Sequence, residues 1–231
     1  MAFRLDTPTS AELREIIVAD AALILGFFMV LNGGIVGLAH GGNVDQALLY
    51  LPIIAIGVTL SFVLHELMHK FVAQRYGAIA GFRTSAMGLA ITVASGMFGF
   101  LLGIPGATMI YVHSFTKRQN GLVSLAGPLT NFVIFGVALA LLFAINPPLN
   151  SYIEKALGFT IFISLFLAFF NMLPIMPLDG SKVLAWSKPV YAVVMGALLV
   201  LMITFAVIPI IYLLYMLGFA ILISFLYKNM F

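Results

Sequence analysis

The stretch "SFVLHELMHKF", residues 61–71, holds two histidines and a glutamate at a spacing suited to metal chemistry. On an α-helix, positions i and i+4 share one face, so His65 and His69 can direct both imidazoles at one ion. Glu66 projects nearby without needing to be a ligand. The H-E-x-x-H pattern is typical of zinc hydrolases, in which the histidines are ligands and the glutamate is the general base.

Two histidines leave such a site incomplete, because a catalytic zinc usually has three protein ligands and one open position for water. The strongest candidate for the third ligand is Asp179, in "NMLPIMPLDGSK" at residues 171–182. Pro174 and Pro177 interrupt the helix before it and free backbone carbonyls, so this segment is expected to line a polar cavity. The alternative is that Asp179 only caps a helix at residues 180–186.

These residues belong to a strongly apolar chain of 231 residues, of which 63% are hydrophobic and 8% charged. In soluble domains roughly a quarter of residues are charged, so the composition predicts an integral membrane protein in contact with the lipid bilayer. Ionisable groups inside a membrane are costly and usually functional. This favours the metal interpretation over the alternative of polar side chains that reach the interface from a helix end. The net charge of +3 is too small to indicate a nucleic-acid partner, and the absence of cysteine excludes thiolate ligands.

Runs without charge predict six membrane-spanning helices, because about 20 apolar residues cross a hydrocarbon core of ~30 Å. The last run is long enough for two spans joined by a turn near Pro209. The second is expected to continue as a helix through His69 towards Tyr76. The runs are residues 21–39, 47–64, 121–145, 156–178 and 189–227.

Residues 84–116 carry no formal charge and contain several glycines. Basic residues flank both ends, and a segment that enters the membrane and returns keeps them on one side. We therefore expect a re-entrant, β-hairpin-like loop between the second and third spans, since irregular backbone is tolerated where protein buries it. "GLAITVASG" at residues 88–96 is short and partly β-branched, which favours a strand. The alternative is a pair of short, broken helices.

The predicted fold class is an all-α, polytopic membrane protein with this loop. No internal repeat or long linker divides the chain, so a single transmembrane domain is expected over residues 1–231. Its core, residues 47–182, holds all of the motifs. Residues 1–46 and 183–231 are expected to form peripheral spans.

The basic residues predict the orientation of the six spans. With the N-terminus in the cytosol, ten of the eleven Lys and Arg residues face the cytosol and only Lys155 lies outside, as the positive-inside rule requires. Both termini are then cytosolic. His65, His69 and Asp179 lie towards the cytosolic side, and the cell membrane is the expected location of this multi-pass protein.

Three motifs in order resemble the site-2 protease family of intramembrane zinc metalloproteases, peptidase family M50. They are HELMH at 65–69, AGPLTN at 126–131 and NMLPIMPLDG at 171–180. The last motif matches the family's N-x-x-P-x-x-P-L-D-G pattern, and the resemblance covers about residues 47–182.

The resemblance implies a role for individual residues. His65, His69 and Asp179 are implied to bind one Zn²⁺, and Glu66 is implied to be the catalytic acid and base. Asn171 is implied to contact the substrate backbone or to stabilise the oxyanion.

Asn131 in AGPLTN is a second substrate-binding candidate, and the alternative is a helix–helix hydrogen bond. The family also has a membrane-embedded β-hairpin between its first two core spans, in agreement with the loop expected at residues 84–116. Many relatives carry a PDZ or CBS domain. No stretch of this sequence is long and polar enough for either, so a compact form is expected.

The predicted function is hydrolysis of peptide bonds within or near transmembrane segments of membrane-protein substrates, with Glu66 as the general base that activates a zinc-bound water. Such a substrate must unwind locally, and the extended segment could then pair with the edge of a strand at residues 88–96. In this hypothesis Gly88, Ile91 and Val93 bind substrate. The oligomeric state is not predicted.

Two other functions remain open. A membrane zinc transporter can also carry H-E-x-x-H, but it is expected to have several ligands along a pathway and often a histidine-rich loop, whereas this chain has four histidines. An inactive homologue that binds membrane segments is the other alternative, and an intact Glu66 argues against it.

Overall fold

The computed structural model of the chain describes residues 7–40, 44–101, 103–112, 114–205 and 218. Helices dominate these residues, and two short strands form one small sheet. In chain order the elements are α1 (Ser10–Leu31), α2 (Gly34–Ala39), α3 (Val44–Arg75), β1 (Ile79–Thr84), α4 (Ala86–Met97), β2 (Gly106–Tyr111), α5 (Lys117–Ile145), α6 (Tyr152–Asn171), α7 (Asp179–Trp186) and α8 (Lys188–Thr204).

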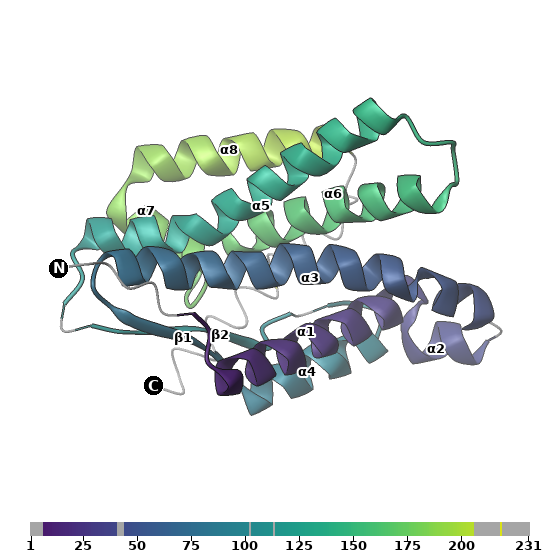
Figure 1. Ribbon diagram of the computed structural model, residues 1–231, viewed down its shortest axis with the longest axis horizontal. Coiled ribbons are helices and arrows are strands. Elements are labelled where there is room, and N and C mark those ends of the chain that lie inside the picture. Colours follow the sequence, from purple (N-terminus) through teal and green to yellow (C-terminus); the bar gives the residue numbers. More distant parts are fainter. Residues whose placement is uncertain (1–6, 41–43, 102, 113, 206–217, 219–231) are drawn as a thin grey trace.

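Helix α3 runs through the middle of the molecule, with α5, α6 and α8 on one side and α1 and α4 on the other (Figure 1). Helices α5 and α6 pack against each other and against α3, while α1 packs on α3 and α4. The short helix α7 packs on α5. The helix that carries H-E-x-x-H and the helix that begins at Asp179 are thus both in contact with α5.

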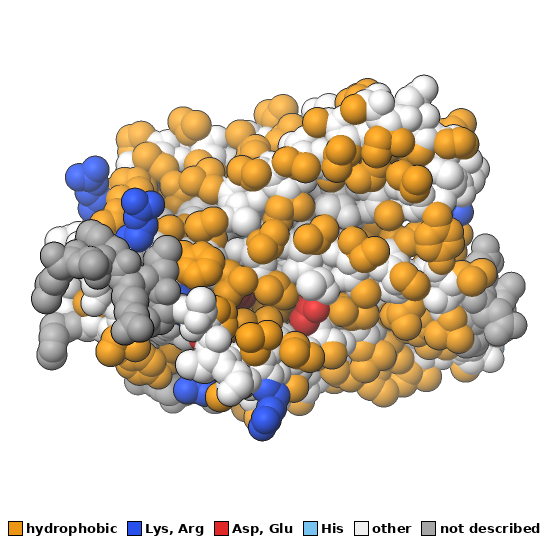
Figure 2. All heavy atoms as spheres, viewed as in Figure 1, with side chains coloured by type: hydrophobic (Ala, Val, Ile, Leu, Met, Phe, Trp, Pro, Cys, Tyr) orange, Lys and Arg blue, Asp and Glu red, His pale blue; other side chains and the backbone are white. Residues whose placement is uncertain are grey.

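Three of the described helices are long and apolar enough to cross a membrane. They are Ala47–Arg75, Lys117–Ile145 and Tyr152–Asn171. Hydrophobic side chains cover most of the face drawn in Figure 2, as expected for a surface that meets lipid. The chain is therefore a mostly helical integral membrane protein, and α3 confirms the helix predicted to continue beyond the second charge-free run.

The other predicted spans agree only in part. The run at 21–39 is divided between α1 and α2, and the run at 156–178 is helical only to Asn171. Helix α8 takes up the first part of the last run, and most of the remainder lies outside the described residues. The count of six spans therefore stays a prediction.

The two strands pair antiparallel, with Phe82 of β1 opposite Thr108 of β2. The outer edge of β1 is occupied by helix α1. The N–H of Phe82 donates to Glu12 Oε1 at 3.0 Å, and the N–H of Thr84 donates to Glu15 Oε2 at 2.7 Å. Helix α1 therefore covers the β1 edge of the sheet. The other edge belongs to β2 and faces away from α1.

The strand expected at residues 88–96 is wrong, because this stretch lies within helix α4. Ser85 caps the helix by accepting the N–H of Gly88. Gly96 lies so close to α1 that an added Cβ would be 2.8 Å from the Cα of Gly26. Close packing of small residues against α1 outweighs the modest β-propensity of the branched side chains. Hairpin-like pairing does occur, but between β1 and β2, the strands that flank α4. The entry of residues 84–116 into the membrane stays a prediction.

Candidate metal centre and active site

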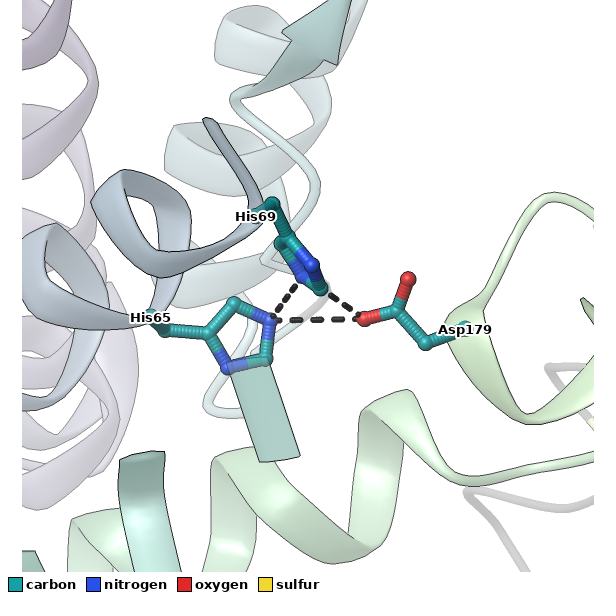
Figure 3. Close-up of side chains that lie close together, drawn as sticks. All are labelled: His65, His69 and Asp179. Atoms are coloured by element: carbon teal, nitrogen blue, oxygen red, sulfur yellow. Dashed lines mark hydrogen bonds and ion pairs between the residues drawn. The ribbon is translucent and has the colours of Figure 1, made fainter. Parts of the chain in front are cut away.

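Two histidines of α3 and the first residue of α7 point toward one another (Figure 3). The Nε2 atoms of His65 and His69 are 3.0 Å apart. Oδ2 of Asp179 lies 3.4 Å from Nε2 of His65 and 3.0 Å from Nε2 of His69. All three residues are buried. The structure therefore brings together the three predicted ligands, although Asp179 is more than a hundred positions away in the sequence.

The spacing of these three atoms suits a zinc ion. A tetrahedral zinc with bonds of about 2.0–2.1 Å places its ligand atoms about 3.3–3.4 Å apart. Nδ1 of His69 is 2.8 Å from the carbonyl oxygen of Val123, which can only accept, so Nδ1 carries a proton, and in the neutral imidazole Nε2 presents a lone pair. Lone pairs of Nε2 and a carboxylate oxygen facing one point repel each other unless a cation lies between them. The donor set fits zinc.

The turn before α7 places the carboxylate of Asp179. Leu178 is the N-cap of α7 and makes no side-chain capping bond, so the alternative in which Asp179 caps the helix is wrong. A Cβ at Gly180 would overlap the carbonyl oxygen of Met172 and lie 2.6 Å from that of Leu173. Only glycine permits this close approach of two backbone segments. The glycine of the L-D-G sequence thus lets the chain turn back beside the end of α6.

Helix α5 supplies a second glycine that the sequence did not single out. A Cβ at Gly127 would lie 2.5 Å from Nε2 of His65 and would also overlap Nε2 of His69. The missing side chain lets both imidazoles pack directly on the α5 backbone. The glycine of the AGPLTN motif therefore has a structural role beside the two histidines.

A cavity of about 110 Å³ adjoins the cluster, large enough for several water molecules. Its wall includes the three candidate ligands and Glu66 on one side and residues 103–108 and Ile110 on the other. Lys182 also borders it, with Nζ 3.9 Å from Oδ1 of Asp179. Glu66 therefore borders the same cavity as the three candidate metal ligands.

Glu66 is held by a residue that the sequence did not reveal. The N–H of Thr108 donates to Glu66 Oε2 at 3.0 Å, and Thr108 Oγ1 donates to the same oxygen at 2.9 Å. Thr108 Oγ1 also lies 3.1 Å from the backbone carbonyl oxygen of Glu66. Strand β2 thus contacts the predicted general base directly.

The remaining predicted site residues differ in position. Asn171 lines the cavity, and its Nδ2 donates to the carbonyl oxygen of Leu167 at 3.0 Å. Asn131 is fully buried and is not part of the cavity wall, and neither atom of its amide has a hydrogen-bond partner among the described residues. A role for Asn131 in substrate contact has no support from this position.

Gly88, Ile91 and Val93 lie in α4 and are absent from the described residues that line the cavity. The prediction that they form a substrate-binding strand edge is wrong, because a helix uses its own backbone groups internally. The edge that borders the cavity belongs to β2.

A membrane protein with H-E-x-x-H on one helix, a third carboxylate ligand and a water-accessible cavity falls in the class of metal-dependent hydrolases. Comparison with known proteins narrows this class. Residues 146–208 match peptidase family M50.

Three relatives illustrate the similarity. The chain is 40% identical over 153 residues to "Putative zinc metalloprotease MJ0611" of Methanocaldococcus jannaschii, covering 66% of this chain and 78% of that protein. It is 31% identical over 160 residues to "Putative zinc metalloprotease Rip2" of Mycobacterium tuberculosis, covering 62% and 61%. It is 28% identical over 149 residues to "Putative zinc metalloprotease YwhC" of Bacillus subtilis, covering 58% and 68%. No solved structure matches the chain.

The chain belongs to peptidase family M50, the family of zinc metalloproteases to which its motifs point. The names of these relatives and the His65–His69–Asp179 cluster agree on zinc as the metal.

Proposed function

We propose that the protein is an intramembrane endopeptidase that hydrolyses peptide bonds within or near transmembrane segments of other membrane proteins. One observation carries this proposal: Glu66 borders the same cavity as the buried His–His–Asp cluster. Membership of family M50 and the long apolar helices support it.

Each group around the cavity has a part in the proposed reaction. When bound, zinc lowers the pKa of a coordinated water and polarises a peptide carbonyl. Glu66 takes a proton from the attacking water and later gives a proton to the leaving nitrogen. Asn171, in the cavity wall, contacts the substrate backbone or the developing oxyanion.

The substrate is proposed to bind as an extended strand along the outer edge of β2. In an antiparallel pair, the backbone N–H and C=O groups of successive residues alternately bond to the partner strand and face away from it. The N–H of Phe82 bonds to Glu12 rather than to β2. The backbone groups of its partner Thr108 therefore also face away from β1, as do those of Gly106 and Ile110. All three of these β2 residues line the cavity. Strand addition at this edge would present a peptide bond beside the metal.

The orientation proposed from the sequence places the site towards the cytosol, with both termini cytosolic and the protein in the cell membrane. The positive-inside rule supports this proposal. In Figure 2, most of the visible Lys and Arg side chains lie in the left half of the view, toward the end of the molecule at which α7 lies in Figure 1.

The transporter alternative requires a series of binding sites across the membrane. Within the described part of the chain there is a single cluster of three or more potential ligands, His65, His69 and Asp179. A single site beside a potential general base favours hydrolysis over transport.

The test uses the protein reconstituted in lipid vesicles with a single-span membrane protein as substrate, and compares wild type with Glu66→Gln. Both are expected to bind one zinc per chain, and only wild type is expected to cleave. Zinc flux without cleavage would support the transporter, and zinc binding with neither flux nor cleavage would support the inactive homologue.

A further inference from the structure

Thr108 makes an unusual set of contacts for a strand residue. Its N–H and its hydroxyl both donate to the single oxygen Oε2 of Glu66, and the hydroxyl oxygen also lies near the backbone carbonyl oxygen of Glu66. The backbone N–H that donates to Glu66 is also one of the groups on this edge to which an added peptide strand would bond.

Thr108 also stands at the centre of the β2 edge that faces away from β1, an edge that pairs with no other strand among the described residues. The backbone groups of Gly106, Thr108 and Ile110 face away from β1, and Glu66 already accepts the N–H of Thr108, the middle one of the three. A peptide strand that pairs along this edge must supply its own carbonyl to the N–H of Thr108. The carboxylate of Glu66 and the substrate therefore compete for one donor.

The opposite edge of the sheet offers the substrate no alternative. Glu12 and Glu15 accept the outward N–H groups of Phe82 and Thr84. Glu12 is buried and is also paired with Lys70 of α3. In contrast, Glu66 and Thr108 are both only half-buried and border a cavity with room for a carboxylate to move.

We propose that Thr108 is a positioning residue that couples substrate pairing to the release of Glu66. Without substrate, Thr108 holds the carboxylate on the edge of β2. When an extended peptide pairs with β2, its carbonyl takes the N–H of Thr108, and Glu66 is freed to act on the water. This inference rests on the proposed function, because it assumes an extended peptide substrate.

The first test measures binding and needs no turnover. Glu66→Gln keeps an acceptor for the N–H of Thr108, whereas Glu66→Ala removes it, and both lack the general base. The probe is a fluorescently labelled single-span peptide with a glycine-rich, helix-weakening centre, added to each variant in lipid nanodiscs. We expect Glu66→Ala to bind it about 2- to 10-fold more tightly, the range that corresponds to one neutral hydrogen bond.

Equal affinities of the two variants, or no binding to either, would overturn the coupling. Zinc content and thermal unfolding midpoints of both variants serve as controls for folding. If wild type does not cleave but the affinities differ as expected, the coupling stands and the proposed function fails. If wild type cleaves and the affinities are equal, the proposed function stands and the coupling fails.

The second test separates coupling from a merely structural role. Thr108→Val keeps the backbone N–H but removes the hydroxyl that donates to Glu66, so the substrate competes with a Glu66 carboxylate that is bound less tightly. We expect KM to fall several-fold, and Thr108→Ser to restore the wild-type KM. An unchanged or higher KM would contradict the proposal, because general damage to the site predicts no gain in apparent affinity.

Discussion

Substitution of Gly127 by alanine should disrupt the candidate metal centre, although its helix α5 supplies none of the three candidate ligands. An added Cβ would lie 2.5 Å from Nε2 of His65, whereas ordinary contacts begin at 3.4 Å. The imidazole or the helix must therefore move by about 0.9 Å, the difference between these two distances. Metal sites tolerate displacements of about 0.2 Å in ligand distance. Both histidines are affected, because the same Cβ overlaps Nε2 of His69.

The expected loss of zinc affinity is about 100-fold or more. Removal of one group that only orients a ligand typically costs 10- to 100-fold in affinity, and here two ligands are displaced. A 100-fold loss corresponds to about 2.8 kcal/mol, at 1.4 kcal/mol per tenfold. The measurement is competition with a zinc chelator of known affinity in detergent solution.

Gly136→Ala is the matched control, because it makes the same change on the same helix at a position where a Cβ has no neighbour within 4 Å. Both substitutions favour the helix by up to about 1 kcal/mol, so helix propensity does not separate them. Wild-type zinc affinity in Gly127→Ala would refute the close approach of α5 to the two histidines.

Other positions give further expectations. Gly180→Ala should lower zinc affinity and the unfolding midpoint, since its Cβ would overlap backbone carbonyls of the preceding turn. Gly196→Ala, at an open position of α8, should leave zinc affinity unchanged and should not lower the midpoint. Glu12→Gln should lower the free energy of unfolding by about 3–5 kcal/mol, because it leaves Lys70 buried without its charged partner; an unchanged denaturation curve would argue against the pair. The pKa of Glu15 lies below its ordinary value because backbone and guanidinium donors of β1 stabilise its carboxylate. Its contribution to stability is present above pH 4.5 and is lost as the pH falls through the lowered pKa, so the difference in unfolding midpoint between wild type and Glu15→Gln should shrink on acidification. A difference that grows with acid would contradict this assignment.

The ligand set could be predicted from the sequence because local rules determine most of it. The spacing of His65 and His69 follows from helical periodicity, and Asp179 follows from its prolines and from the direction of the spans. Thr108 and Gly127 could not be found in this way. Each acts through a contact with a distant segment, and neither a threonine in an apolar strand nor a glycine in an apolar helix carries a local signal for such a contact.

The fold shows the same division between local and long-range causes. Long charge-free runs predict α3 and α5 because backbone groups in lipid must bond within their own helix. Residues 88–96 were wrongly predicted as a strand because β-propensity is weak beside tertiary packing. In the structure this stretch is a helix that packs closely on α1, with Gly96 beside Gly26.

The carbonyl oxygen of Val123, which holds Nδ1 of His69, is a main-chain atom. No side-chain substitution at this position can delete it, so any residue that a buried helix accepts at 123 preserves the proton arrangement of the ligand. In a comparison of related sequences this position could therefore change between side chains that fit the buried cluster while its role stayed constant. A part of the metal centre would leave no trace in patterns of amino-acid identity and could be recognised only from the path of the backbone.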